Sequence, residues 1–230
     1  MTITGEAITF PAQSMPQLQG YLARPDGDGP FPALVVIHEA FGLNDDIRAI
    51  TRRFAGAGYV ALAVDLFSGR SQFLCMARLF AGMLRNSLDH AGVRDLKDAL
   101  TFLERLPGVD TARIGAVGYC MGGSLAIALA CSDGRLKAIA PYYAMNPRPV
   151  AAVARACPVV GSYPERDFTA KAGSALEAEL DKHGVAHDIK IYPGAGHSFF
   201  NGGRNHNPEA AQDSWQRVMA FFGEHISSKQ

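Results

Sequence analysis

The sequence has no excess of charge of either sign, and this absence excludes whole classes of partner. Lys plus Arg and Asp plus Glu number 22 each in a chain of 230 residues. A balanced chain has no overall field to attract nucleic acid or an anionic membrane surface. We therefore expect no nucleic-acid and no membrane partner, and a ligand has to be argued from a local site.

Long apolar runs are also missing. No stretch reaches the roughly 18 to 20 apolar residues that a membrane-spanning helix needs. The opening residues, MTITGEAITFPAQSMP, contain no basic segment followed by an apolar run, which is the pattern of a secretory signal. We therefore expect a cytoplasmic protein.

Cysteine is scarce and unpaired in the sequence. The four cysteines are Cys75, Cys120, Cys131 and Cys157, and no two of them form a CxxC pair. Zinc knots and disulfide frameworks need such pairs or a higher cysteine density. The dinucleotide fingerprint GxGxxG does not occur in the glycine-rich segment GAVGYCMGG either. We expect free thiols, no metal and no cofactor.

What the chain does contain is a series of short apolar segments separated by amphipathic ones. Near-continuous apolar character indicates strands that are buried on both faces, as in a parallel sheet. The predicted strands are residues 33–39, 59–65, 113–119, 136–143, 157–163 and 187–194, and the predicted helices are residues 45–58, 93–106, 170–184 and 209–226. Residues 7–25 read as two further strands in an antiparallel hairpin at one sheet edge.

This alternation predicts an α/β fold. We expect a mostly parallel, doubly wound sheet of about seven or eight strands, flanked by helices, with an antiparallel N-terminal edge. The length and the 48% hydrophobic content suit a single domain over residues 1–230. Residues 66–92 have an irregular pattern and are the candidate cap over a site.

The segment Gly118-Tyr119-Cys120-Met121-Gly122 follows a predicted strand and precedes an apolar helix. Strand, G-x-nucleophile-x-G and helix together describe a nucleophile elbow, in which a tight turn lifts one side chain above the sheet. Bulkier residues at Gly118 and Gly122 would clash with the neighbouring strand and helix. A helix N-terminus would favour the thiolate of Cys120. The alternative is a small buried cysteine in an ordinary strand-to-helix crossover.

An acid and a histidine follow the elbow in the order that such hydrolases require. Asp167 comes after the strand at 157–163, and His197 lies in the glycine-rich loop after the strand at 187–194. Glu165 in the same loop is an open alternative to Asp167, and Asp188, inside a predicted strand, is a poorer one. His38 closes an apolar strand and is interpreted as structural. The other histidines are interpreted as surface residues; they are His90, His183, His187, His206 and His225.

A transition-state oxyanion needs two backbone N–H donors. Met121, directly after the candidate nucleophile, supplies one, and Ala40, in the loop after the strand at 33–39, is expected to supply the other. Glu39 precedes Ala40 at the end of an apolar strand. A carboxylate in that place must be paired or carry a desolvation penalty.

At these motifs the chain resembles the dienelactone hydrolase family of the α/β-hydrolase superfamily, whose members use a cysteine nucleophile. The matching segments are HEAFGLN (38–44), YVALAVDLF (59–67), GAVGYCMGG (115–123), GSYPERD (161–167) and AGHSFF (195–200). The resemblance implies that Cys120 is the nucleophile, Asp167 the orienting acid and His197 the base. It also implies that Glu39 takes the thiol proton when substrate binds, which protects the resting thiol from oxidation.

The resemblance is weaker where the substrate would bind. Family members hold a substrate carboxylate with arginines, and one of these follows the catalytic histidine, where this chain has Asn201, with Arg204 slightly beyond. Arg78 and Arg85 in the candidate cap could replace it. Aromatic residues near the motif loops suggest an apolar pocket. The candidate substrate-binding residues are Arg85, Arg78, Tyr143 and Phe199.

The sequence therefore predicts a hydrolase that opens a lactone or small ester by acyl transfer to Cys120. One alternative is a general carboxylesterase or thioesterase on the same core. Another is a ligand-binding protein that keeps the fold without turnover, because fold alone does not imply activity. The expected partner is a small ester or lactone, and the expected state is a monomer or a small homo-oligomer.

Overall fold

A computed structural model describes residues 2–227 and contains one eight-stranded sheet in the order β1-β2-β4-β3-β5-β6-β7-β8. The strands are β1 (Ile3–Ala12), β2 (Met15–Pro25), β3 (Phe31–Ile37), β4 (Val60–Asp65), β5 (Val109–Tyr119), β6 (Leu136–Tyr142), β7 (Val159–Arg166) and β8 (His187–Gly196). The helices are α1 (Asp45–Gly56), α2 (Gln72–Arg85), α3 (Ala91–Glu104), α4 (Met121–Ser132), α5 (Ala170–His183) and α6 (Pro208–Phe222), with the short turns η1 (Val150–Arg155) and η2 (Gly223–Ser227).

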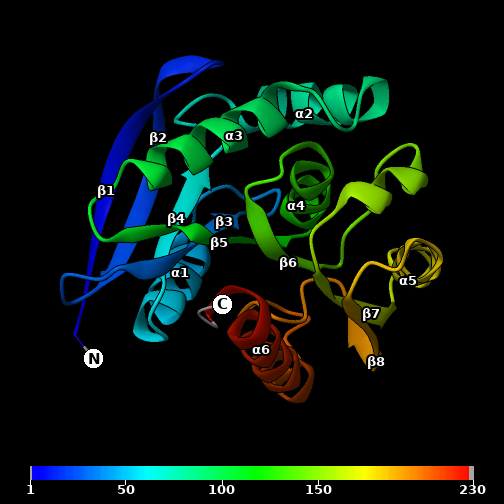
Figure 1. Ribbon diagram of the computed structural model, residues 1–230. Helices are drawn as coiled ribbons and strands as arrows, with labels where there is room; N and C mark the ends of the chain where they lie inside the picture. Colours follow the sequence, from blue (N-terminus) through cyan, green and yellow to red (C-terminus); the bar gives the residue numbers. More distant parts are fainter. Residues whose placement is uncertain (1, 228–230) are drawn as a thin grey trace.

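The antiparallel edge and the parallel interior are both confirmed. Strand β1 pairs with β2 and β2 with β4 in antiparallel register, whereas β4, β3, β5, β6, β7 and β8 run parallel to one another. The interior strands lack alternation because helices cover both faces of the sheet (Figure 1). The fold is that of an α/β-hydrolase with an antiparallel N-terminal edge.

Each face of the sheet carries its own apolar core. Helices α3, α4 and α5 pack on one face, where Leu96, Leu125 and Leu176 belong to a single buried cluster. Helices α1 and α6 pack on the other face, where Phe54 and Phe222 belong to a second cluster. Figure 1 shows these two helical layers above and below the strands.

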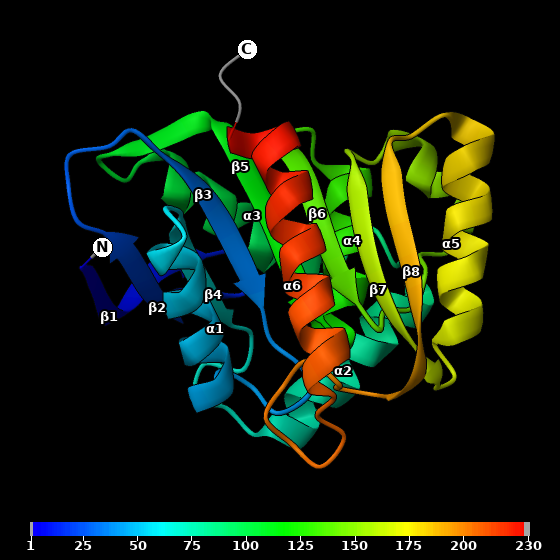
Figure 2. The same cartoon turned by 90° about the horizontal axis from the view of Figure 1, so that it is seen from below.

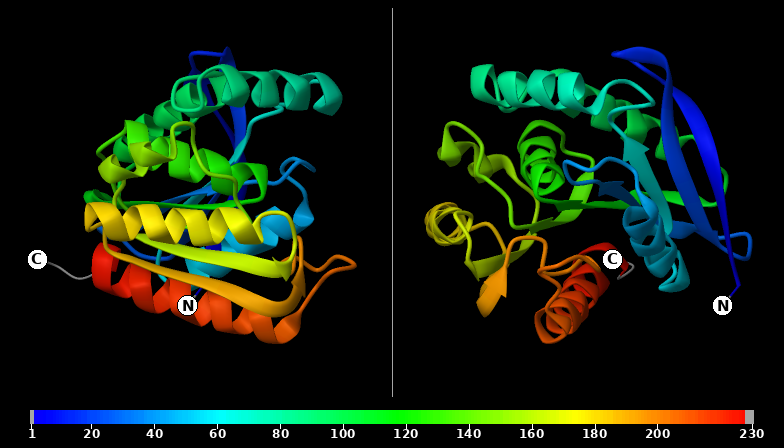
Figure 3. Two further views of the ribbon diagram at one scale, coloured as in Figure 1. Left: turned by 90° about the vertical axis from the view of Figure 1, so that its right-hand side faces the viewer. Right: turned by 180° about the vertical axis from the view of Figure 1, so that it is seen from behind.

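The segment predicted as irregular, residues 66–92, is mostly a regular helix. Helix α2 spans Gln72–Arg85 and buries only Cys75 and Leu79, and in the left view of Figure 3 it projects beyond the other helices. The sequence did not reveal it because many of its residues are apolar although only two of them reach the core. The surface assignment of His90 was wrong, since this buried side chain accepts a hydrogen bond from Gly92 N and caps α3.

The parallel strands end at one edge of the sheet, where the loops with chemical side chains gather. In Figure 2, β3 points toward the edge that carries α2 and the loop before α6. His38, directly after β3, is buried; its Nδ1 bonds Glu39 O at 2.6 Å and its Nε2 accepts Leu66 N at 3.1 Å. The structural interpretation of His38 is confirmed. No helix among residues 2–227 is both long and apolar enough to cross a membrane.

Candidate active site

The turn between β5 and α4 presents Cys120 in a conformation that side chains rarely adopt. Its φ is 53° and its ψ −115°, between a strand that ends at Tyr119 and a helix that begins at Met121. Two backbone bonds hold this geometry, from Cys120 N to Tyr142 O at 3.0 Å and from Ser124 N to Cys120 O at 3.1 Å. Strain of this kind persists only where the surroundings fix it and is common at functional sites.

The glycines of the turn are required by space, as the sequence indicates. A Cβ on Gly118 would overlap the carbonyl group of Gly122, and a Cβ on Gly122 would overlap the backbone oxygens of Ile37 and His38. Because backbone atoms cannot move aside as a flexible side chain can, both positions tolerate only hydrogen. The close approach brings the start of α4 against the end of β3.

Asp167 and His197 come together from two different loops. His197 Nδ1 bonds Asp167 Oδ2, and the carboxylate side chain is almost fully buried. Thr169 N donates to the second oxygen of Asp167 at 2.8 Å, and Asn205 Nδ2 donates to His197 O at 2.9 Å. The carboxylate of Asp167 accepts a hydrogen bond from His197 Nδ1, so Nδ1 carries the ring proton. Nε2 is then the unprotonated, basic nitrogen.

The two rival acids are engaged elsewhere. Glu165 accepts a hydrogen bond from Gly194 N at 2.9 Å. Asp188, at the start of β8, forms an ion pair with Arg217 at 2.6 Å. Of the three acids considered, Asp167 alone contacts the imidazole of His197.

Glu39 is a nearly buried carboxylate beside the thiol of Cys120. Glu39 is only 5% exposed, and its Oε1 accepts a hydrogen bond from Ser198 Oγ at 2.9 Å. Burial and the negative charge of Glu39, in that order, raise the pKa of Cys120 to about 11. The thiol is therefore neutral near pH 7. Among the described residues, no hydrogen bond joins Cys120 Sγ to His197.

Of the two predicted oxyanion donors, Met121 directly follows Cys120 and Ala40 lines the same cavity as Cys120. Met121 is the first residue of α4, so its N–H has no acceptor within the helix, and it points toward Cys120 Sγ. Ala40 follows Glu39 in the loop after β3. Its carbonyl accepts Gln72 Nε2 at 2.6 Å, which ties this loop to the first turn of α2.

These side chains open on a cavity of about 540 Å³. Of the predicted site residues, Glu39, Ala40, Cys120 and His197 line it, and Asp167 lies behind the imidazole. The remaining lining residues are Phe41, Asn44, Asp46, Ser198, Asn201, Gly203, Arg204 and Asn205.

The structure does not bring Arg78 or Arg85 to this cavity. Arg78 lines a separate small cavity with Arg70 and Asp95, and Arg85 is an exposed residue in the last turn of α2. Both arginines lie away from the Cys120 cavity because α2 extends away from the turn that contains Cys120. The arginine that does line the cavity is Arg204, and Asn201 lines the same cavity.

Tyr143 and Phe199 are buried, and Tyr143 lies between Phe199 and the His197 ring in a chain of ring contacts. The Tyr143 ring lies 4.9 Å from the His197 ring and 5.7 Å from the Phe199 ring. Burial and the charge of Glu39 hold the pKa of the Tyr143 phenol well above its usual value. Neither residue is among those that line the cavity, and Tyr143 is the one of the two whose ring contacts the imidazole.

Three residues that shape the site were not predicted from the sequence. Ser198 holds Glu39, Gln72 holds the Ala40 loop, and Phe168, 72% exposed, stacks on the His197 ring at 5.6 Å. Ser198 and Phe168 are direct neighbours of His197 and Asp167, and this adjacency was the available signal. Nothing local marks Gln72. No group of residues within 2–227 has the geometry to hold a metal ion.

A nucleophile elbow at the carboxyl edge of this sheet, followed by an acid and a histidine on later loops, defines an α/β-hydrolase. The chain belongs to the dienelactone hydrolase family, whose model matches residues 18–226. It is thus a hydrolase of that family.

Individual relatives agree over nearly the whole chain. A Saccharolobus solfataricus protein named "Putative carboxymethylenebutenolidase" is 32% identical, with 90% of this chain and 93% of that protein covered. A Synechocystis protein of the same name is 33% identical, with 94% of each chain covered. The crystal structure of a "Putative Dienelactone Hydrolase" from Klebsiella pneumoniae superposes with a TM-score of 0.85 at 27% identity, covering 97% of this chain and 100% of that one.

Proposed function

We propose that the protein hydrolyses small lactones and activated esters with Cys120 as the nucleophile. The observation that carries the proposal is that Cys120, Glu39 and His197 open on one cavity, with Asp167 bonded to the far nitrogen of the imidazole. A nucleophile, a base and a group that orients the base are the elements of covalent catalysis.

In the resting site the thiol keeps its proton. Burial and Glu39 raise the pKa of Cys120, so the nucleophile has to be activated after a substrate arrives. A bound substrate that displaces the Ser198 hydroxyl from Glu39 frees this carboxylate to accept the thiol proton. The new thiolate then lies at the N-terminus of α4, where the helix dipole stabilises it.

The reaction then proceeds through an acyl-enzyme. Cys120 Sγ attacks the carbonyl carbon, and the N–H groups of Met121 and Ala40 hold the oxyanion. The C–O bond breaks, and the thiol proton, passed from Glu39 to Nε2 of His197, is given to the leaving oxygen. In a second step His197 takes a proton from water, which attacks the thioester, and Cys120 leaves as the thiolate. Amides are poor substrates because the thiolate is a better leaving group than an amine.

The preferred substrate is an enol-lactone that carries a carboxylate. The relatives are named for a butenolide with a carboxymethylene group, and the chain supplies one cavity-lining arginine, Arg204, to bind such an anion. A planar guanidinium pairs with a carboxylate through two hydrogen bonds.

A plain carboxylesterase or thioesterase is the second candidate. The cavity lining also contains the acids Glu39 and Asp46, so the acids outnumber its single arginine. Asn201 stands where family members carry an arginine after the histidine. Phe41 is exposed at the rim. A neutral, partly apolar ester suits this lining as well as an anionic lactone does.

A hydrolysis screen separates the two candidates. Purified wild type, Cys120→Ala and the matched control Cys157→Ala are tested on cis- and trans-dienelactone, p-nitrophenyl acetate and an acyl thioester. We expect dienelactone turnover in wild type and Cys157→Ala and none in Cys120→Ala, because Cys157 lies outside the cavity lining.

Each of the other outcomes of the screen leads to a different conclusion about the reaction. Cys120-dependent turnover of the plain ester or thioester alone supports the second candidate. A loss of dienelactone turnover in Arg204→Gln with ester turnover retained assigns the carboxylate to Arg204. Full turnover in Cys120→Ala contradicts the cysteine mechanism, and an absence of turnover on all substrates favours a ligand-binding protein.

A further inference from the structure

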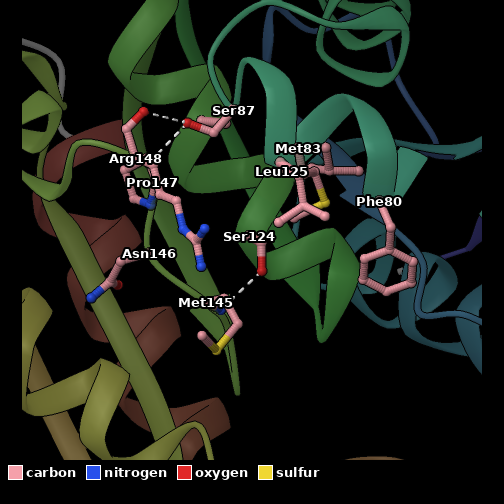
Figure 4. A pocket seen from close by; sticks show the side chains of 11 residues that line it. Phe80, Met83, Ser87, Ser124, Leu125, Met145, Asn146, Pro147 and Arg148 are labelled. Carbon is pink, nitrogen blue, oxygen red and sulfur yellow. Dashed lines mark hydrogen bonds between the residues drawn. The ribbon is translucent and has the colours of Figure 1, made fainter. Parts of the chain in front are cut away.

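A second cavity, of about 210 Å³, lies between α2, α4 and the loop that joins β6 to η1 (Figure 4). Helix α2 contributes Phe80, Met83 and Leu84, and α4 contributes Ser124, Leu125 and Ala128. Among the described residues, none lines both this cavity and the one that contains Cys120. The second cavity therefore has a lining of its own, to which α4 contributes residues one to two turns after Cys120.

The walls of this cavity are apolar and remain partly uncovered by the chain. Leu84 is 68% exposed, Phe80 47% and Met145 44%, although all three are large apolar side chains. Leu125 and Ala128, on the opposite wall, are buried. A bound apolar group would remove the exposed side chains from water, which is favourable in proportion to the area covered.

Arg148 is the one charged residue in the lining. No ion pair or side-chain hydrogen bond to its guanidinium is formed by any residue within 2–227. Its backbone is fixed on both sides by Ser87, whose Oγ donates to Arg148 O at 3.0 Å and accepts from Arg148 N at 2.9 Å. In Figure 4 the guanidinium points from the loop toward α4, on the side where Ser124 lies.

We propose that this cavity binds a small apolar carboxylate, the size of benzoate or phenylacetate, with its ring between Phe80 and Leu125 and its carboxylate on Arg148. A cavity of about 150 Å³ holds benzene, so 210 Å³ leaves room for one ring and a carboxylate. An unpaired guanidinium above apolar walls matches the two ends of such an anion. An acid in the lining would oppose it, and the lining contains none.

The site is independent of the proposed function, since it contains none of the residues that line the Cys120 cavity. It is nevertheless only one helical turn away. Ser124 Oγ donates to Cys120 O at 3.3 Å and accepts a hydrogen bond from Met145 N at 2.9 Å. The wall of the second cavity is thus tied to the elbow.

Titration of the ¹⁵N-labelled Cys120→Ala protein with phenylacetate tests the proposal without turnover. We expect saturable amide shifts at Met145 and in α2, and at least about tenfold weaker binding of the neutral analogue phenylacetamide. Arg148→Gln should weaken the binding of phenylacetate at least about tenfold. Leu84→Glu should weaken it as much, because it places a negative charge, like that of the ligand, at an exposed position of the wall. The matched control Arg85→Gln, outside the lining, should bind as the parent does.

Three results would overturn the proposal. One is equal affinity for phenylacetate in the parent and in Arg148→Gln. Another is a set of shifts confined to the surroundings of His197, which would place the anion in the other cavity. The third is the lack of saturable shifts up to about 10 mM phenylacetate. The ¹⁵N spectrum of each variant reports whether it is folded, so a folding defect is not mistaken for lost binding.

Discussion

Cys120 lies in surroundings that act on its thiol in opposite directions. The N-terminus of α4 and the Met121 N–H favour the thiolate, whereas burial and Glu39 disfavour it. From the sequence, the helix terminus was expected to favour a thiolate. Burial and Glu39 outweigh it, so that the pKa of Cys120 rises to about 11. The resting side chain is therefore a neutral thiol and not a thiolate.

The first prediction concerns alkylation of this thiol. In the free protein, iodoacetamide should react with Cys120 about tenfold faster for each pH unit between 7 and 10, because the thiolate fraction below the pKa rises by that factor. Glu39→Gln removes a negative charge, lowers the pKa of Cys120 and should speed alkylation at pH 8 while slowing ester turnover. The measurement is the rate of carboxamidomethylation of Cys120 by mass spectrometry.

Glu165→Gln is the matched control, because Glu165 bonds Gly194 N and does not act on the thiol. It should leave the alkylation rate unchanged. Slower alkylation in Glu39→Gln would mean that the carboxylate activates the thiol already at rest.

The second prediction separates Asp167 from its rivals. Asp167→Asn should lower kcat by about three to four orders of magnitude, because an amide no longer fixes the reactive tautomer of His197. Asp188→Asn, which breaks a half-buried ion pair with Arg217 at the start of β8, outside the Cys120 cavity, should leave kcat within about twofold. Steady-state kinetics on the best substrate of the screen provide the measurement. A comparable loss in both variants would contradict the assignment.

At the scale of elements, the junction of β5 and α4 depends on the close approach of two backbones. A Cβ at Gly122 meets the carbonyl oxygens at the end of β3. The third prediction is that Gly122→Ala lowers the free energy of unfolding by about 3 kcal/mol and abolishes turnover, since overpacking against backbone moves the elbow.

Gly134→Ala is the control for this substitution. A Cβ there meets no atom within 4 Å, so the free energy of unfolding should change by no more than about 0.5 kcal/mol. Urea unfolding measures both variants. Equal free energies of unfolding for Gly122→Ala and Gly134→Ala would show that the turn at Cys120 can adjust to a Cβ at position 122.

Helix α2 shows how an element can escape prediction. It has many apolar residues, but only Cys75 and Leu79 are buried, and Phe73, Leu74, Phe80 and Leu84 are exposed. A helix is recognised by an apolar stripe that faces a core, and α2 faces two cavities and solvent instead. Its tie to the Cys120 cavity is the bond from Gln72 to Ala40 O.

At the scale of the whole molecule, two cores share one sheet. The interior strands contribute to both clusters, for example Val35 to one and Val36 to the other. If the helices on one face unpack, they expose to water the same strands on which the helices of the other face pack. This arrangement supports a single cooperative domain.

The fourth prediction follows from this shared sheet. Trp215, the one tryptophan, packs on Phe54 at 4.7 Å between α6 and α1 and reports on one face. Its fluorescence and the far-UV circular dichroism should change at the same urea concentration. A second transition seen only by circular dichroism would show that the α3–α4–α5 face or α2 unfolds independently.

The sequence by itself determined the order along the chain of the strands and of the helices other than α2, the antiparallel edge and the elbow around Cys120. These features show in the sequence as local apolar patterns and as the glycines that flank Cys120, although the atoms that exclude a side chain at Gly122 belong to Ile37 and His38. The positions of Asp167 and His197 after their strands could be predicted for the same reason, because parallel strands end at a common edge.

Only the tertiary structure decided what surrounds those side chains. Arg78 and Arg85 lie away from the Cys120 cavity and Arg204 lies in it, because the direction of α2 depends on packing and not on the local pattern. The raised pKa of Cys120 likewise needs Glu39 beside it, a residue from the loop after β3, 81 positions earlier in the chain. Charge and burial act through space, and distances through space are set by the folded chain as a whole.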